Sequence, residues 1–147
     1  LDDGIEVQPT VVFACRPCDA RGFSVLDRPY LEGPFADPYY KARREALTVV
    51  TITCPSGCNT CFCHWVGGGP SSPEGSDVLM TEVEGGYVLQ AVTPKGEELL
   101  AASSLPDGAE QFPLAEAARK AAWATLEPAP NIKGAPEKLA ALLDALD

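Results

Sequence analysis

Two short apolar runs rich in β-branched residues lie in the first part of this chain, and each leads directly to a cysteine. The first run covers residues 10–14 and precedes Cys15, and the second covers residues 47–53 and precedes Cys54. Short runs of this composition favour buried strands. We therefore predict two buried strands, each with a cysteine at its carboxyl end.

The residues between the two runs predict helices. Asp19 is expected to cap a short helix over residues 20–26, and residues 28–35, which contain proline and glycine, are expected to form a loop. Asp37, which is followed by proline, is typical of a helix start and predicts a second helix through residue 45. Strands joined in this way run parallel, and sites in such sheets form beyond the carboxyl ends of the strands. Both groups of cysteines are therefore expected at the same edge of the sheet.

The second half of the chain predicts a hairpin followed by helices. Residues 77–83 and 87–92 are its expected strands, because the glycines between them tolerate the positive φ of a tight turn. Residues 55–75, before the hairpin, read as a long loop, and loops of that length are usually functional or disordered. Helices are expected in three later segments, over residues 95–102, 114–126 and 136–146.

These elements predict one fold class for the whole chain. We expect an α/β fold: a small mixed sheet with a βαβ unit and a β-hairpin, helices packed around it, and cysteine-rich loops at the carboxyl ends of the strands. The length of 147 residues fits a single cysteine-rich domain, 1–147, of which residues 103–147 are mostly helical. The chain begins with Leu1 rather than Met, so we expect it to be excised from a longer protein.

Charge and hydropathy argue against two classes of partner. The net charge is −10, and an acidic surface repels nucleic acid and anionic membranes. No segment approaches the roughly 20 apolar residues of a membrane helix, and we find no signal-peptide pattern. We expect no nucleic-acid partner and no membrane partner.

The distribution of the cysteines indicates the candidate chemistry. A disulfide-rich domain spreads its cysteines through the fold, whereas here they form two tight groups and the residues after 63 contain none. Clustered thiols indicate a metal, and soft thiolates suit iron–sulfur clusters, zinc and Cu(I). Four thiolates bind a 4Fe-4S cluster, which favours a role in electron transfer. The positions are Cys15 and Cys18 in the first group, and Cys54, Cys58, Cys61 and Cys63 in the second.

Two other functions are compatible with this spacing. Zinc sites pair two short cysteine knuckles, which the first group and the Cys58–Cys61 segment would supply. The chain would then be a zinc-stabilised structural or interaction module. Cys15 and Cys18 could instead act as a redox-sensing dithiol without a metal.

Three further residues close to the cysteines are candidates. His64, the single histidine, follows Cys63 and could be a ligand or a donor to a sulfur, although packing in the loop is its ordinary role. Arg16 and Arg21 could offset the negative charge of a thiolate cluster, although surface arginines are common. No pattern for acid–base or nucleophilic catalysis is found, so the domain alone is not expected to be an enzyme.

Five segments together resemble a known family, and they keep its order along the chain. The segments are RPCDARGFSVLDR (16–28), DPYYKARRE (37–45), TCFCHWVGGGP (60–70), GSDVLMTEVEGGYVL (75–89) and KGEELL (95–100). They resemble the iron–sulfur β subunit of cytoplasmic sulfhydrogenases and the related iron–sulfur subunit of anaerobic sulfite reductase. The resemblance covers about residues 10–100 and is weaker beyond them.

The resemblance implies a place in an electron relay. The chain corresponds to the middle domain of such a subunit, which works in the cytoplasm as part of a hydrogenase or a sulfite or sulfur reductase. Its partners would be two other subunits, one that binds flavin and nicotinamide and one that is catalytic. The parent complex would be an oxidoreductase, and this domain would hold one 4Fe-4S cluster. The implied ligands are Cys18, Cys54, Cys61 and Cys63, with Cys15 and Cys58 as alternates peculiar to this chain.

Overall fold

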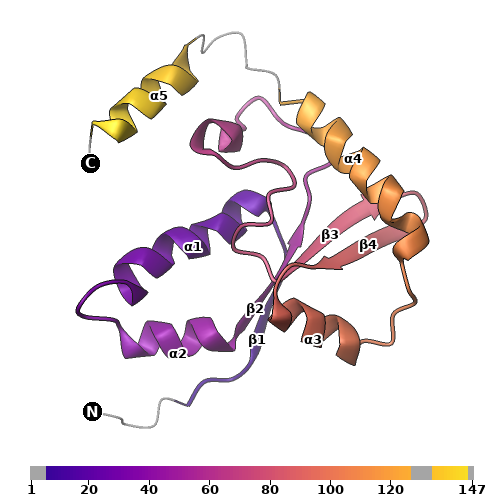
Figure 1. Ribbon diagram of the computed structural model, residues 1–147, viewed down its shortest axis with the longest axis horizontal. Helices are drawn as coiled ribbons and strands as arrows, with labels where there is room; N and C mark the ends of the chain where they lie inside the picture. The colour runs from indigo at the N-terminus through magenta and orange to yellow at the C-terminus, as the bar shows by residue number, and fades with distance from the viewer. Residues whose placement is uncertain (1–5, 127–133, 146–147) are drawn as a thin grey trace.

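A single mixed sheet of four strands forms the centre of the molecule (Figure 1). The computed structural model describes residues 6–126 and 134–145. The strand order is β1-β2-β3-β4; the first three strands are parallel, and β3 and β4 form an antiparallel hairpin. The predicted mixed sheet with a βαβ unit and a hairpin is therefore confirmed. The strands are β1 (Thr10–Cys15), β2 (Leu47–Ile52), β3 (Val78–Val83) and β4 (Gly86–Ala91).

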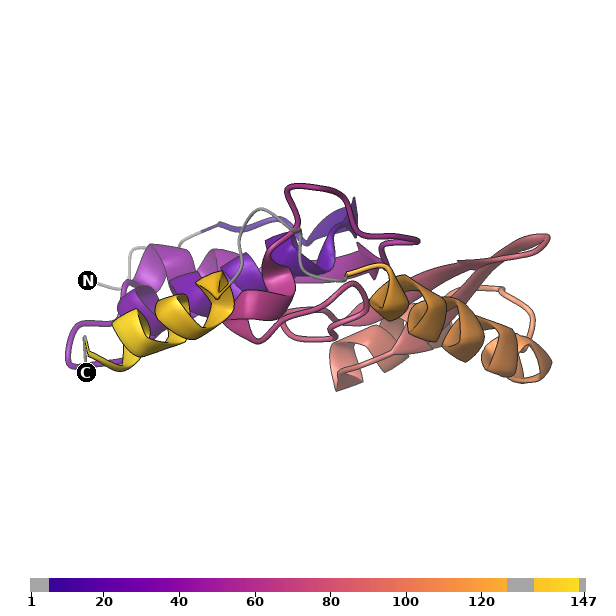
Figure 2. The ribbon, with the colours of Figure 1, turned by 90° about the horizontal axis from the view of Figure 1, so that it is seen from above.

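Helices cover the sheet and lie at both ends of the molecule. From above, α1, α2 and α5 lie toward one end, and α4 and the hairpin lie toward the other (Figure 2). Within the part of the chain that the structure describes, no helix combines the length and apolar character needed to cross a membrane. The α-helices are α1 (Pro17–Leu31), α2 (Pro38–Ala46), α3 (Pro94–Ala102), α4 (Phe112–Ala124) and α5 (Ala135–Asp144); two short 3-10 helices are η1 (Cys63–Val66) and η2 (Ala109–Gln111).

The start of α2 agrees with its sequence signal. The Asp37 carboxylate accepts hydrogen bonds from the backbone N–H groups of Tyr39 at 2.8 Å and Tyr40 at 2.9 Å. These donors have no partner inside the helix, so the cap stabilises its first turn. The hairpin and the three later helices also lie within a few residues of their predicted positions; of the last predicted helix, residue 146 lies outside the described residues.

The first helix is longer than predicted at both ends. Its N-cap is Arg16, whose N–H donates to the Asp19 carboxylate at 3.1 Å, so Asp19 lies inside the first turn rather than capping it. The predicted loop over residues 28–35 was wrong at its start, because α1 continues through Pro29 to Leu31. A proline this close to the carboxyl end removes only one hydrogen bond from the helix.

Contacts with α2 explain why the last turns of α1 persist. Asp27 on α1 accepts hydrogen bonds from the Tyr40 hydroxyl at 2.8 Å and from Arg44 at 3.0 Å. The rings of Tyr30 and Tyr40 stack with their centroids 4.8 Å apart. These tertiary contacts outweigh the local preference of proline for a break, as is common for weak propensities.

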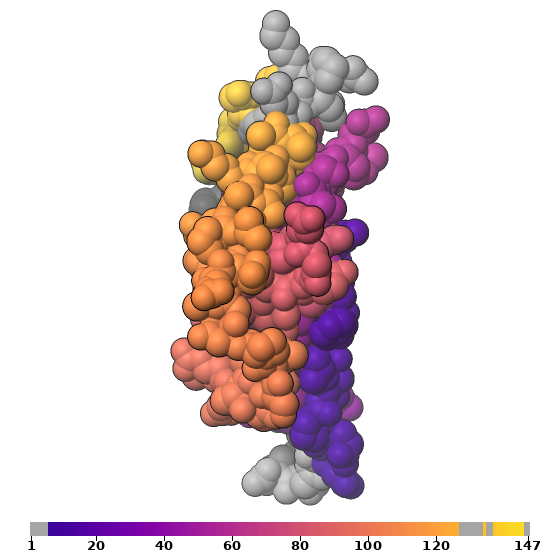
Figure 3. All heavy atoms as spheres, turned by 90° about the vertical axis from the view of Figure 1, so that its right-hand side faces the viewer, coloured from indigo at the N-terminus to yellow at the C-terminus, as the bar shows by residue number. Residues whose placement is uncertain are grey.

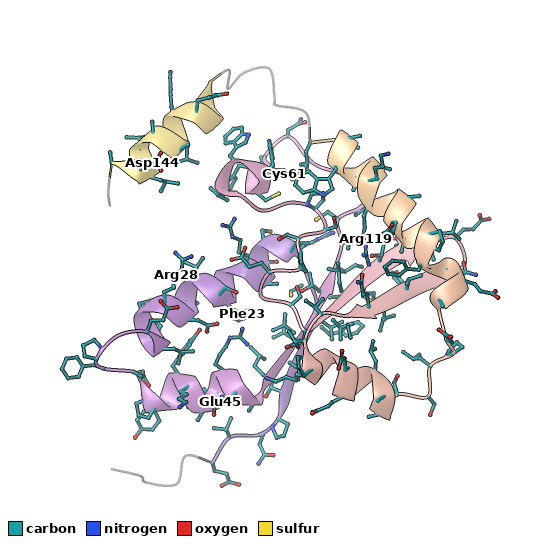
Figure 4. The ribbon with its side chains drawn as sticks, in the orientation of Figure 1. Phe23, Arg28, Glu45, Cys61, Arg119 and Asp144 are labelled. Carbon is teal, nitrogen blue, oxygen red and sulfur yellow. The ribbon has the colours of Figure 1, made fainter. Side chains whose placement is uncertain are left out.

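The two faces of the sheet carry different helices. On one face, buried Val50, Val78 and Met80 pack against α3. On the other face, Arg119 of α4 donates to the Thr81 hydroxyl at 2.8 Å (Figure 4). Figure 3 shows α4 (orange) beside the hairpin (rose) on one side of the molecule. The alternation of side chains along β3 therefore divides the core between α3 and α4.

Buried Asp77 joins β2, the hairpin and α3. Its carboxylate accepts hydrogen bonds from the Val49 N–H at 2.8 Å and the Thr93 hydroxyl at 2.6 Å. Its backbone N–H donates to the Val49 carbonyl, and its own carbonyl accepts from the Val92 N–H, both at 2.8 Å. A Cβ on Gly96 of α3 would lie 1.9 Å from this carbonyl oxygen, so glycine is required for the close approach.

Replacing Asp77 should destabilise the whole fold. In Asp77→Ala, the buried Val49 N–H and Thr93 hydroxyl lose their acceptor, and we expect the free energy of unfolding to fall by about 2–3 kcal/mol. Urea unfolding at pH 7 measures this loss. The matched control is Glu82→Ala at an exposed position of β3, which should change stability by less than about 0.5 kcal/mol. Equal stabilities of the two variants would show that Asp77 does not hold these elements together.

Candidate thiol-rich site

The cysteines gather beyond the carboxyl ends of β1 and β2, but not all of them lie in loops. The predicted cysteine-rich loops are not confirmed, because the first group belongs to a strand and a helix and Cys63 of the second group begins a 3-10 helix. Regular structure begins again immediately after β1, so the chain has no room for a loop there. Cys15 ends β1, Cys18 lies in the first turn of α1, and Cys63 begins η1; Cys54, Cys58 and Cys61 lie in the connection between β2 and η1.

A bulge at the end of β1 sets the direction of Cys15. Ala14 has a φ of 59°, in the left-handed region that residues other than glycine rarely adopt, and the register with β2 shifts between Phe13 and Cys15. Without the bulge, Cys15 would share a face with Phe13. With it, Cys15 is paired with Thr51, and their Sγ and Oγ1 atoms lie 3.6 Å apart. Strain and bulges of this kind concentrate at functional sites.

Cys18 and Cys54 bring the two groups of cysteines together. Partial desolvation raises the pKa of the Cys18 thiol, and the Asp19 carboxylate and the nearby Cys54 sulfur raise it further. Cys54 follows β2 and is held by a 2.8 Å hydrogen bond from its N–H to the Pro70 carbonyl. The parallel pairing of β1 and β2 therefore places one thiol from each group within electrostatic reach of the other.

Cys58 and Cys61 form a contact pair in the following turn. Their Sγ atoms lie 3.1 Å apart, the Cys58 N–H donates to the Cys61 sulfur at 3.1 Å, and the Cys61 N–H donates to the Cys58 carbonyl at 3.0 Å. The Thr60 hydroxyl is 3.2 Å from the Cys58 sulfur. This hydroxyl, followed by the Cys61 thiol, lowers the pKa of Cys58 to about 7.

The pKa of Cys61 moves in the opposite direction. The Cys58 N–H favours the Cys61 thiolate, but the neighbouring Cys58 sulfur and partial burial favour its protonated form, and the balance raises the pKa. The exposed Cys58 is therefore the more acidic thiol of the pair, and the Cys61 thiol donates a hydrogen bond to it.

Helix α1 fastens the loop that carries Cys63. Arg21 donates through Nη1 to the Val66 carbonyl, and its Nε lies 3.0 Å from a Glu74 carboxylate oxygen. Gly68 donates its N–H to the Cys63 carbonyl at 2.8 Å and closes the end of η1. Arg21 was a candidate for offsetting cluster charge; in the structure it is engaged in ordering this loop.

Helix α4 fastens the same loop from the other side. The Trp123 indole donates to the Ser71 hydroxyl at 3.2 Å, and the Gly57 N–H donates to the Thr125 hydroxyl at 2.7 Å. A Cβ on Gly69 would lie 2.0 Å from the Trp123 ring, so the indole packs directly on the loop backbone. Figure 4 shows Cys61 beside η1, on the connection that leads from β2 to η1.

His64 lies in η1 with both ring nitrogens buried. Within the described residues neither nitrogen has a hydrogen-bond partner, and the Trp65 ring packs edge-on at a centroid distance of 5.6 Å. Helix α5 contacts η1 here. A buried nitrogen without a hydrogen-bond partner lowers the stability of the fold by about 1–3 kcal/mol. The two His64 nitrogens therefore favour a partner that the described side chains do not supply. A bound group beside Cys63 would supply the missing partner.

Sequence patterns did not reveal several of these residues. The Ala14 bulge leaves no mark in composition, because alanine carries no preference for the left-handed region. The roles of Arg21 and Trp123 depend on contacts between segments far apart in the chain. Thr60 had a local signal, since a hydroxyl between two cysteines of a C-x2-C pair lies within reach of either sulfur.

A single metal ion and an iron–sulfur cluster require different arrangements of thiolates. Within residues 6–126 and 134–145, no three side chains of His, Cys, Asp or Glu converge closely enough to hold a single ion. An iron–sulfur cluster is larger, and each of its four irons takes one thiolate from the protein. Cys18 lies within electrostatic reach of Cys54, and His64 beside Cys63 has two buried nitrogens without a partner among the described residues, so the thiol chemistry of this edge is compatible with a bound group of that kind.

The fold and the site define a small α/β domain with a thiol-rich edge, and comparison with known proteins adds one relative. The chain is 33% identical over 90 residues, 61% of its length, to the sulfhydrogenase 2 subunit beta of Pyrococcus furiosus. The resemblance that the sequence indicates is confirmed over a length that fits a middle segment. The chain spans about a quarter (26%) of that subunit's length. No family model matches the chain, and no solved structure matches it.

In the metal-free chain, Cys58 should be the first thiol to react with iodoacetamide. Thiolates are the reactive form, and a pKa of about 7 makes Cys58 roughly half ionised at pH 7, whereas the raised pKa keeps Cys18 protonated. The rate at Cys58 should rise as the pH passes through about 7. Thr60→Val removes the hydroxyl and should move this midpoint to higher pH. Mass spectrometry of each alkylated position provides the measurement; an unchanged midpoint would contradict the assigned cause.

Removing the Arg21 contacts should loosen the loop without unfolding the domain. Arg21→Gln loses the ion pair with Glu74 and weakens the bond to Val66, so we expect chymotrypsin to cleave after Phe62 or Trp65 about fivefold faster. The matched control is Arg43→Gln on α2, where the guanidinium donates a hydrogen bond to the Tyr39 carbonyl of its own helix. Identical cleavage rates in the two variants would show that Arg21 does not fasten the loop.

Proposed function

We propose that this chain is an electron-transfer domain that binds one 4Fe-4S cluster through Cys18, Cys54, Cys61 and Cys63. The observation that carries the proposal is that thiols follow the ends of two neighbouring parallel strands, with Cys18 and Cys54 close enough to interact electrostatically. The similarity to a sulfhydrogenase β subunit supports a redox role of hydrogenase type. When bound, the cluster would accept and donate one electron at a time.

The surroundings of the four thiols support a site close to the surface. Phe62, between Cys61 and Cys63, is 58% exposed, and the turn that carries Cys58 is also exposed. An electron relay has to approach its donor and its acceptor, and solvent exposure and hydrogen bonds to sulfur set its potential. Hydrogen bonds from Arg21 of α1 and Trp123 of α4 nevertheless hold the loop in place. These contacts help to fix the positions of the thiols that the loop carries.

The partners belong to the same proposal. The chain covers 26% of the relative's length, so we propose that it is one domain, 1–147, of a larger cytoplasmic iron–sulfur subunit. That larger protein would pass electrons between a partner that binds flavin and nicotinamide and a catalytic partner. The parent complex would be an oxidoreductase, and this domain would contribute the relay rather than the catalysis.

One observation favours a second function, that of a zinc-stabilised interaction module. The Cys58 and Cys61 sulfurs lie 3.1 Å apart. Two thiolates on one tetrahedral zinc lie about 3.8 Å apart, given a Zn–S bond of about 2.3 Å. The distance between the Cys58 and Cys61 sulfurs is therefore closer to that of two thiolates on one ion than to that of two thiolates on separate irons. The zinc site would need two more ligands from the first cysteine group.

An anaerobic count of iron, sulfide and zinc distinguishes the two functions. The electron-transfer proposal expects about four irons and four sulfides per chain and a broad visible absorption that bleaches with dithionite. The zinc alternative expects about one zinc and no iron. Protein made in zinc-free medium should unfold under the zinc alternative, because metal binding would then supply folding free energy.

Serine variants test the four proposed ligands individually. Each of Cys18→Ser, Cys54→Ser, Cys61→Ser and Cys63→Ser should reduce the iron bound per chain by more than about half, because a lost thiolate leaves one iron without its protein ligand. Cys15→Ser and Cys58→Ser are the matched controls and should retain the iron of the unaltered chain. Loss of iron in a control, together with retention in one of the four, would reassign the ligand set.

A further inference from the structure

We propose that Cys58 and Cys61 form a reversible disulfide in the metal-free chain, and that this bond withholds Cys61 from the metal site. The disulfide is inferred from the contact pair itself. Only its effect on metal loading rests on the proposed function, in which Cys61 is a ligand and Cys58 is not.

The geometry selects this pair among the cysteines. The Cys58 and Cys61 sulfurs are 3.1 Å apart, and a disulfide needs about 2.05 Å, so a shift of roughly 1 Å closes the bond. The turn already holds both residues, through hydrogen bonds between the Cys61 N–H and the Cys58 carbonyl and between the Cys58 N–H and the Cys61 sulfur. Among the described residues, no other two cysteine sulfurs lie within hydrogen-bond distance of each other.

The alternative dithiol of the first group has no such arrangement. The Cys15 sulfur lies beside the Thr51 hydroxyl, and the Cys18 sulfur lies 3.8 Å from the Asp19 carboxylate. The bulge at Ala14 fixes Cys15 on the strand, whereas Cys18 belongs to the first turn of α1. The sequence suggested a redox-active dithiol at Cys15 and Cys18. The structure favours Cys58 and Cys61 for that chemistry, because their sulfurs are in contact.

Exposure gives the two thiols different roles. Cys58 is exposed, as are Asn59 and Thr60 beside it, so a small disulfide such as glutathione disulfide reaches its sulfur without rearrangement of the loop. Cys61 is half-buried below it. Cys58 is therefore the attacking thiol, and Cys61 is the resolving thiol.

The reaction consumes one glutathione disulfide. The Cys58 thiolate attacks one sulfur of glutathione disulfide, the bond between the two glutathione sulfurs breaks, and the leaving thiolate takes up a proton. The Cys61 thiolate then attacks the Cys58 sulfur of the mixed disulfide and releases a second glutathione, which takes up the second proton. The two protein thiols lose two electrons, and glutathione disulfide gains them. A Cys61 sulfur held in this bond has no thiolate to offer to a metal.

The disulfide is tested on the 147-residue chain after removal of metal. The chain is equilibrated anaerobically with glutathione buffers of increasing oxidising strength. Free thiols are alkylated with one reagent, and thiols released by reduction are alkylated with a second. We expect two positions, Cys58 and Cys61, to oxidise together with a mass loss of two hydrogens. Cys15→Ser is the matched control and should behave identically, whereas Cys58→Ser should form no internal disulfide.

Three results overturn this part of the proposal. They are oxidation at any other pair of positions, a mixed disulfide with glutathione that never resolves, and an internal disulfide that persists in Cys58→Ser. These measurements need no iron. They therefore test the disulfide even if the iron and sulfide count contradicts the electron-transfer proposal.

The effect on metal loading is tested with zinc alone, which does not reduce disulfides. Zinc is titrated into the reduced and the oxidised chain after glutathione is removed, and a chromophoric chelator reports the affinity. We expect the oxidised chain to bind zinc at least about tenfold more weakly, because a ligating thiolate is lost. Equal affinities would show that the disulfide does not withhold Cys61 from the metal site.

Discussion

Parallel pairing of β1 with β2 is the constraint on which the thiol-rich edge depends. The pairing aligns the carboxyl ends of both strands, so Cys18, which follows β1, lies within electrostatic reach of Cys54, which follows β2. Buried Asp77 stabilises this arrangement, because its carboxylate and backbone bind β2 at Val49 while α3 packs on its carbonyl. The polar network therefore lies in the core of the sheet, and the thiols lie at its edge.

The loop after β2 obtains its order from the helices on both sides of it. Arg21 of α1 and Trp123 of α4 contact it at separate points, and glycines at the contacts allow close packing. A loop held in this way can present thiols without a regular backbone of its own, as binding loops on rigid scaffolds commonly do. The buried, unpartnered nitrogens of His64 lie in the same segment, which is consistent with a bound group completing it.

Sequence patterns predicted the elements of the fold more successfully than the details of the site. The β-branched runs, the Asp37 cap and the glycines of the hairpin have local causes, and all three lie where they were expected. The break expected near Pro29 was wrong, because contacts between α1 and α2 outweigh a local preference. The positive φ at Ala14 and the contact between Cys58 and Cys61 arise from tertiary packing and loop geometry, which residue types do not encode individually.

The central claim is that these thiols hold a redox-active cluster, and electron paramagnetic resonance of the anaerobically isolated chain tests it most directly. A 4Fe-4S cluster is expected to be silent as isolated and to give a signal of about one spin per chain after reduction with dithionite. That signal should disappear in Cys54→Ser and remain in Cys15→Ser. A chain that stays silent after reduction and contains zinc in place of iron would contradict the account.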